Sequence, residues 1–307
     1  MNAPRRPPRR SVDGVLLLDK PLGLTSNAAL QTARRIYNAA KAGHTGTLDP
    51  LATGLLPLCF GEATKFAGEL LEADKAYDAT IQLGITTDTA DAEGQVLVTR
   101  PVKVTRQQVE AVLRRFSGDI MQVPPMHSAL KRDGKPLYEY ARQGIELERA
   151  SRCVRIHALD LRDFRGDRLW ISVDCSKGTY IRTLAEDIGA ALGCGAHLVA
   201  LRRTRIGRLG VDQALALADL EAMDSERRDA LLSPIDALLE DLPRAELGEA
   251  DAARLCHGQA IRWNGLAGRW RAYSRGTFLG LCELGADGWL SPRRLIVTTS
   301  ENSKANA

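Results

Sequence analysis

Residues 43–54, GHTGTLDPLATG, combine three glycines, three threonines and an Asp-Pro pair. Pro50 disfavours the helical conformation for Asp49, and the flanking glycines give the backbone unusual freedom. The stretch therefore predicts a shaped loop that presents Asp49 to a ligand. Taken alone, an aspartate before proline is more often a local hydrogen-bonding residue of a turn than a nucleophile.

The segments on either side of this loop predict regular structure. VDGVLLLDKP has the pattern of a buried strand that ends at Pro21, and Thr25 or Ser26 can cap a helix that runs to about Tyr37. Beyond the loop the pattern predicts a strand at 55–60, a helix at 62–73 and a strand at 75–83.

Further strands and helices follow at 96–99, 105–116, 154–164, 169–175 and 179–192. Most of the strands alternate apolar and polar residues, which is typical of antiparallel pairing with one face covered. We therefore predict an α+β fold, with a mixed, largely antiparallel sheet and flanking helices.

Composition changes along the chain predict its division into parts. The excursion MHSALKRDGKPLYEYARQG is basic, residues 219–251 carry 11 acids and three arginines, and residues 252–300 carry seven arginines and two acids. Glycines between short apolar runs near the C-terminus are typical of a small β-barrel. The expected parts are a disordered basic arm at 1–10, a main domain at 11–215 with an excursion at 126–150, an acidic helical or linker region at 216–250, a barrel domain at 251–300 and a tail at 301–307.

Composition also excludes several classes of protein. Of 307 residues 44% are hydrophobic and 26% charged, as in an ordinary soluble protein, and no apolar run approaches a membrane span. The first ten residues contain arginines without an apolar stretch behind them, so we expect no signal peptide and a cytoplasmic location. The six cysteines form no CxxC pair and the five histidines show no ligand spacing, so we expect no metal.

The net charge of +4 equals the four arginines of residues 1–10, so the remainder of the chain is neutral as a whole. A basic module behind an acidic segment suggests a polyanionic partner such as nucleic acid, although solvated surface charge is the simpler explanation. The arginines at 202, 203, 205 and 208 suit phosphate contacts or an exposed basic strand. The chain contains no GxxxxGK[ST], GxGxxG, GxSxG or HExxH motif, which leaves a carboxylate acting without metal or cofactor.

Several long motifs resemble one known family. GVLLLDKPLGLTS and AGHTGTLDPLATGLLPLCFGEATK, followed by KAYDATIQLGITTDTADAEG, VPPMHSALKRDGKPLYEYARQG, VDCSKGTYIRTLAEDIG and LRRTRIG, resemble the TruB family of tRNA pseudouridine synthases in their order. The motifs cover about residues 13–210. The resemblance implies the pseudouridine synthase fold, a PUA-like C-terminal RNA-binding domain, and isomerisation of uridine 55 in the T-loop of tRNA without a cofactor.

The resemblance also implies roles for individual residues. Asp49 matches the catalytic aspartate and Arg182 the arginine that pairs with it, with Asp91 as a possible second partner of this arginine. Tyr77 matches the tyrosine that stacks on the flipped base and assists proton transfer. The other matches are substrate-pocket positions: His44, Tyr180, Leu201 and Lys20.

Without the resemblance, simpler interpretations would be favoured for most of these positions: a loop histidine, a core tyrosine, a surface arginine and a lysine at a strand end. The excursion resembles the bacterial stand-alone branch, so we expect tRNA as partner and neither a guide RNA nor an obligatory protein partner. Two alternatives remain. One is a non-catalytic RNA chaperone that opens tRNA, and the other is a base-releasing glycosidase, which would need a second carboxylate.

Overall fold

A computed structural model describes residues 8–296 of the chain. The predicted tail at 301–307 and most of the predicted arm at 1–10 lie outside these residues. Arg10, which was assigned to the arm, is instead paired: its backbone N–H donates to Asn38 O (2.7 Å) and its carbonyl accepts from Ala40 N (2.9 Å). The ordered chain therefore begins before residue 11.

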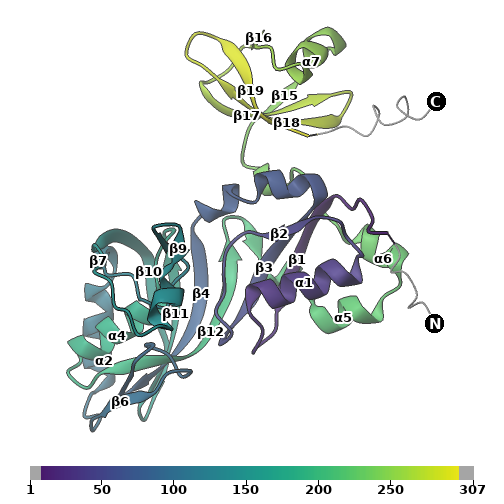
Figure 1. Cartoon of the computed structure of the whole chain (residues 1–307). Coiled ribbons are helices and arrows are strands. Elements are labelled where there is room, and N and C mark those ends of the chain that lie inside the picture. Colours follow the sequence, from purple (N-terminus) through teal and green to yellow (C-terminus); the bar gives the residue numbers. More distant parts are fainter. Residues whose placement is uncertain (1–7, 297–307) are drawn as a thin grey trace, which may run out of the picture.

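A large sheet forms the centre of the main part (Figure 1). Within the described chain it has ten strands, and the main path runs in the order β14 (Leu215–Ala216), β1 (Gly14–Lys20), β3 (Ala52–Phe60), β12 (Ala196–Ile206), β4 (Lys75–Leu83), β11 (Arg168–Cys175), β10 (Arg152–Arg165) and β7 (Gly118–Gln122). Two short strands lie off this path, β2 (Ala42–His44) beside β3 and β13 (Leu209–Gly210) beside β12.

The sheet is mixed and largely antiparallel, as the alternating strands predicted. The pairs β1–β14 and β12–β3 are parallel, whereas β12–β4, β4–β11, β11–β10 and β10–β7 are antiparallel. On β4 the residues Tyr77, Ala79 and Ile81 are buried, in keeping with the period of two of a strand with one covered face.

Two of the three longest α-helices begin at a threonine cap, whereas α4 (Ile181–Ala191) begins without a side-chain cap. Thr25 accepts from Ala28 N at the start of α1 (Ser26–Ile36), and Thr105 forms a capping box with Gln108 at α2 (Arg106–Arg115). The other α-helices are α3 (Leu137–Ala141), α4 (Ile181–Ala191), α5 (Leu217–Ala222), α6 (Ser225–Ala230) and α7 (Glu249–Cys256).

The prediction of one helix at 62–73 is wrong. The segment forms two short 3₁₀ helices, η1 (Gly61–Phe66) and η2 (Glu69–Leu71), separated at Gly68. Phe66 packs with Phe278 of the C-terminal module, whereas Leu70 packs against the main part. Two further 3₁₀ helices are η3 (Val211–Gln213) and η4 (Ala237–Leu239).

The excursion contains β8 (Lys131–Arg132), β9 (Lys135–Pro136) and α3. A second small hairpin, β5 (Ile85–Thr87) and β6 (Val96–Thr99), precedes α2. The acidic region predicted at 216–250 as helical or linker contains α5, α6 and η4. No helix among residues 8–296 is long and apolar enough to cross a membrane.

The C-terminal module is a curled sheet that stands apart from the main part in Figure 1. Its five strands in the described chain follow the order β15 (Arg244–Glu246), β17 (Gly268–Ser274), β18 (Thr277–Leu284), β19 (Trp289–Leu295) and β16 (Ile261–Arg262), which fits a PUA-like domain. Because β15 pairs with β17, the module begins earlier than the predicted residue 251. Where the module joins the main part, the ring centroids of Phe66 and Phe278 lie 5.5 Å apart.

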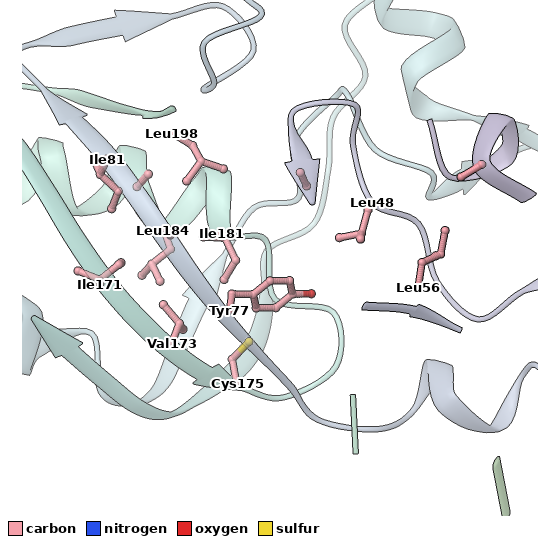
Figure 2. Packing of buried hydrophobic residues seen from close by; sticks show 14 of the residues in the cluster. Leu48, Leu56, Tyr77, Ile81, Ile171, Val173, Cys175, Ile181, Leu184 and Leu198 are labelled. Carbon is pink, nitrogen blue, oxygen red and sulfur yellow. The ribbon is translucent and has the colours of Figure 1, made fainter. Parts of the chain in front are cut away.

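The main core lies between the sheet and its helices. Figure 2 shows Ile181 and Leu184 of α4 close to Ile171 and Val173 of β11, with the Tyr77 ring extending from β4 toward Leu48. Leu48 directly precedes Asp49, so this packing connects the central strand to the loop that the sequence singled out.

Candidate active site

The loop that carries Asp49 joins β2 to β3, and the start of α1 holds it in place. Leu48 N donates to the Ser26 hydroxyl (2.7 Å), and this hydroxyl donates to Leu48 O (3.0 Å). Gly23 N donates to Pro50 O (2.9 Å). Hydrogen bonds on both sides of Asp49 therefore fix its backbone. The sequence predicted Ser26 only as a possible helix cap, whereas its hydroxyl holds the residue before Asp49.

Arg182 lies at the beginning of α4 and contacts two carboxylates. Its Nη2 is 3.1 Å from Asp49 Oδ2, and its Nη1 is 3.5 Å from Asp91 Oδ2. The side chains of Arg182 and Asp91 are 7% and 4% exposed, whereas that of Asp49 is 39% exposed. Of the three groups, Asp49 is thus the one that solvent or a ligand can reach.

Backbone carbonyls complete the surroundings of Arg182. Nη2 donates to His127 O (2.6 Å) and Nη1 to Thr89 O (3.4 Å). Asp91 in turn accepts from Thr89 Oγ1 (2.6 Å) and from Glu93 N (3.0 Å). The guanidinium is therefore fixed in direction by acceptors that do not depend on Asp49.

Opposing effects act on the ionisation of Asp49. Burial raises the pKa of its carboxyl above the usual value, and the nearby Asp91 raises it further, while Arg182 and Lys20 lower it. Glu93 also has a raised pKa, caused by burial and then by repulsion from Asp91 and Asp49. The two cations thus favour the ionised form of Asp49 where burial opposes it.

Lys20 is fully buried at the end of β1. Its Nζ donates to Leu24 O (2.6 Å) and Pro21 O (2.9 Å), which closes the turn that leads to α1. Burial lowers the pKa of Lys20 to about 8, against the opposing effect of Asp49. Lys20 therefore acts on Asp49 through charge and lies outside the lining of the cavity described next.

A cavity of about 600 Å³ opens in front of Asp49 and Arg182. It is lined on one side by the start of α1 and by His44, and on the other by the excursion, including His127, Ser128, Lys131, Tyr138 and Arg142. Ser128 is 4% exposed, and its hydroxyl has no hydrogen-bond partner among the described residues. A buried hydroxyl without a partner is costly, so it is available to a ligand in the cavity.

His44 lines this cavity five residues before Asp49. Gly46 N donates to its Nδ1 (3.4 Å). Burial lowers the pKa of the imidazole, and the positive charge of Arg203 lowers it further. His44 is accordingly a neutral ring at pH 7, which suits packing against a base.

Tyr77 is 8% exposed and belongs to the main core. Burial raises the pKa of its phenol, while Arg203 acts in the opposite direction. Tyr77 therefore belongs to the core and is not among the residues that line the cavity.

Tyr180 and Leu201 are also absent from the lining of this cavity. Tyr180 precedes α4, where it exchanges backbone hydrogen bonds with the Gln122 side chain, and the Arg152 guanidinium lies 5.0 Å from its ring centre. Leu201 pairs with Ala52 and Ala79 in the sheet and lines a separate depression near Trp170.

The predicted row of phosphate-binding arginines is not available as a set. Arg202, Arg205 and Arg208 form salt bridges with Asp19, Asp174 and Glu240, respectively. Arg203 is buried. Sequence spacing could not reveal this, because the partners lie 31 residues or more away along the chain.

The described residues contain no group of three or more His, Cys, Asp or Glu side chains that could hold a metal ion. All six cysteines lie within these residues, and none of them forms a disulfide. The lining of the cavity offers three carboxyl groups (Asp49, Asp91 and Glu93), three cations (Lys131, Arg142 and Arg182), two histidines and several hydroxyl groups.

Comparison with known proteins agrees with this geometry. The model of the TruB family pseudouridylate synthase N-terminal domain matches residues 34–181, and two C-terminal domain models, of tRNA pseudouridylate synthase B and of pseudouridine synthase II TruB, match 182–240 and 243–296. The chain belongs to the TruB family. It is therefore a pseudouridine synthase, and the resemblance that its motifs showed is confirmed.

Relatives and solved structures support the assignment over nearly the whole chain. This TruB family member is 62% identical to tRNA pseudouridine synthase B of Aromatoleum aromaticum, covering 95% of each chain. It is 59% identical to the protein of the same name from Dechloromonas aromatica, covering 94% of this chain and 96% of that one. A structure of an H/ACA RNP bound to a substrate RNA, at 23% identity and a TM-score of 0.71, covers 94% of this chain and 86% of that chain and shares the fold.

Proposed function

We propose that this enzyme isomerises uridine 55 in the T-loop of tRNA to pseudouridine. The observation that carries the proposal is the Asp49–Arg182 pair facing a cavity of about 600 Å³, large enough for a nucleotide turned out of its loop. The names of its relatives, which specify tRNA, support the same substrate class.

In the proposed reaction Asp49 is the catalytic group. Ionised Asp49 acts as a nucleophile or assists cleavage of the bond between uracil N1 and ribose C1′. Any bond that Asp49 forms as a nucleophile breaks again by the time C5 is bonded to C1′, which restores the carboxylate. The uracil then rotates, and C5 bonds to C1′ while the C5 proton is lost and N1 gains a proton. Atoms and electrons balance without an oxidant, which agrees with a site built from a carboxylate and cations.

The other predicted site residues have different places relative to the cavity, and we propose a role for each. Arg182 and Lys20 favour ionised Asp49, and the neutral ring of His44 lines the cavity where the target base would leave its stack. We assign base stacking and proton transfer to Tyr77, and further target-pocket contacts to Tyr180 and Leu201. Because these last three side chains lie outside the cavity lining, their roles require the substrate to contact residues beyond that lining.

The RNA would approach between the excursion and the start of α1. Lys131 and Arg142 line the excursion side of the cavity and offer cations to phosphates. We assign the C-terminal PUA-like module to RNA binding as well. We also propose that the enzyme acts in the cytoplasm and needs neither a guide RNA nor an obligatory protein partner, as the resemblance of its excursion to the stand-alone branch implies.

A direct assay tests this function. The purified protein is incubated with an unmodified T-stem-loop RNA, and the products are analysed for pseudouridine and for free uracil. Pseudouridine at the position of uridine 55 supports the proposal. Free uracil would instead indicate a base-releasing glycosidase, and refolding of tRNA without any modified product would indicate a chaperone.

A further inference from the structure

Arg203 is a buried cation in the centre of the large sheet. It is 1% exposed and lies on β12 between β3 and β4. Among the described residues no carboxylate forms a salt bridge with it, and burial lowers its pKa. Because a buried charge is costly unless polar groups surround it, the contacts of this guanidinium identify what it does.

Two of these contacts are backbone carbonyls near the candidate site. Arg203 Nε donates to Leu55 O (2.8 Å), and Nη2 donates to Gly46 O (3.3 Å) on the loop that carries Asp49. The close approach of β12 to β3 depends on Gly54, where a Cβ atom would lie 2.3 Å from Arg203 O. The absence of a side chain at Gly54 therefore allows the backbone of Arg203 to lie close to β3, the strand that contains Leu55.

The third contact is the hydroxyl of Tyr77. Arg203 and Tyr77 are direct partners in the antiparallel pairing of β12 with β4, and their side chains form a hydrogen bond. A guanidinium only donates hydrogen bonds. The Tyr77 oxygen therefore accepts, which leaves its own O–H free to donate to another group.

We propose that Arg203 is a positioning residue that ties the Tyr77 hydroxyl to the loop carrying Asp49. It directs the Tyr77 O–H away from the guanidinium and keeps the phenol and Gly46 in a fixed relation while the base is bound. This inference rests on the role assigned to Tyr77 under the proposed function. Arg203 itself does not line the cavity, so it acts through these two partners.

A double-mutant cycle of Arg203→Gln and Tyr77→Phe tests the tie. We expect Arg203→Gln to lower the single-turnover rate on T-stem-loop RNA by about tenfold or more, and Arg203→Lys, which keeps a donor and the charge, by clearly less. In the Tyr77→Phe background the effect of Arg203→Gln should shrink to about threefold, because no hydroxyl remains to be held. Arg168→Gln, an exposed arginine of β11 beside Gln82, is the matched control and should retain the parental rate.

Thermal unfolding and RNA binding are measured for each variant. A variant that folds and binds RNA like the parent but reacts slowly has a misplaced Tyr77 hydroxyl rather than a misfolded chain. A second readout is the absorbance titration of Tyr77, taken as the difference between each protein and its Tyr77→Phe counterpart. Loss of the guanidinium should raise the pKa of Tyr77, because Arg203 opposes the effect of burial. This titration needs no activity, so it remains informative in a variant that turns over slowly.

Equal rate losses from Arg203→Gln in both backgrounds, with an unchanged Tyr77 titration, would overturn the inference. If Tyr77→Phe kept the parental rate, the assigned role of Tyr77 and the inference that rests on it would both fail, although Asp49-dependent isomerisation would stand. If Asp49→Asn remained active, the proposed function would fail instead. The two failures are therefore distinguishable.

Discussion

Arg182 Nη2 lies 3.1 Å from Asp49 Oδ2, on the wall of a cavity that the excursion and the start of α1 enclose. The arginine is buried and held by two carbonyls and by Asp91, whereas Asp49 is more than a third exposed. The protein thus fixes the cation and leaves the carboxylate accessible. Burial raises the pKa of Asp49, and the charge of Arg182 opposes that rise.

The first prediction concerns this pair. Arg182→Lys keeps a charge but loses the planar fork, so we expect a large fall in single-turnover rate with a smaller change in RNA binding. Arg182→Ala should lower the rate further and move the acid limb of the pH–rate profile to higher pH, because the pKa of Asp49 rises when its cation is removed. An acid limb at the parental pH in Arg182→Ala would contradict the pairing. Unfolding curves are needed beside the rates, since Asp91 loses the same partner.

The second prediction concerns Lys20, whose charge also lowers the pKa of Asp49. Lys20→Met removes a charge that lowers the pKa of Asp49, so its acid limb should also move to higher pH, by less than in Arg182→Ala. Arg182 lowers the pKa of Asp49 more strongly than Lys20 does. A larger shift in Lys20→Met than in Arg182→Ala would show that Lys20 is the principal partner.

The third prediction separates the position of Asp49 from the stability of the fold. Ser26→Ala removes both hydrogen bonds to Leu48, so we expect a loss of about 1–3 kcal/mol in unfolding free energy together with a reduced turnover number. Thr105→Ala, which removes the cap of α2 far from the site, should cost about 1 kcal/mol and leave turnover unchanged. Equal turnover in the two variants would show that the loop does not need this clamp.

Much of this arrangement follows from local sequence, and the rest does not. The caps at Thr25 and Thr105, the strand alternation and the loop around Asp49 are local signals, and the structure contains each of them. Burial of Arg203 depends on β12 lying between β3 and β4, which no local pattern encodes. For the same reason the sequence suggested phosphate contacts for arginines that the fold pairs internally.

Residues 62–73 form two short 3₁₀ helices where the local pattern predicted one helix. Gly68, a residue type that is unfavourable inside a helix, lies between them, and Phe66 and Leu70 pack in different clusters. Ser128 is a comparable case in the site, because only the fold shows that its hydroxyl is buried beside the cavity.

The fourth prediction concerns metal. Protein treated with a chelator should retain its full rate on T-stem-loop RNA, since the donor groups of the described residues form no cluster suited to a metal ion. The comparison is made with the same RNA at the same ionic strength. Activity that disappears and returns only with one transition metal would contradict this expectation.

The most direct test of the central claim is the single-turnover rate of Asp49→Asn on T-stem-loop RNA. This change keeps the size of the side chain and removes its charge, so folding and RNA binding should persist. We predict that pseudouridine formation falls below detection, while the unfolding curve and the dissociation constant stay near the parental values. Pseudouridine formed at a rate comparable with the parent would contradict the assignment of Asp49 as the catalytic residue.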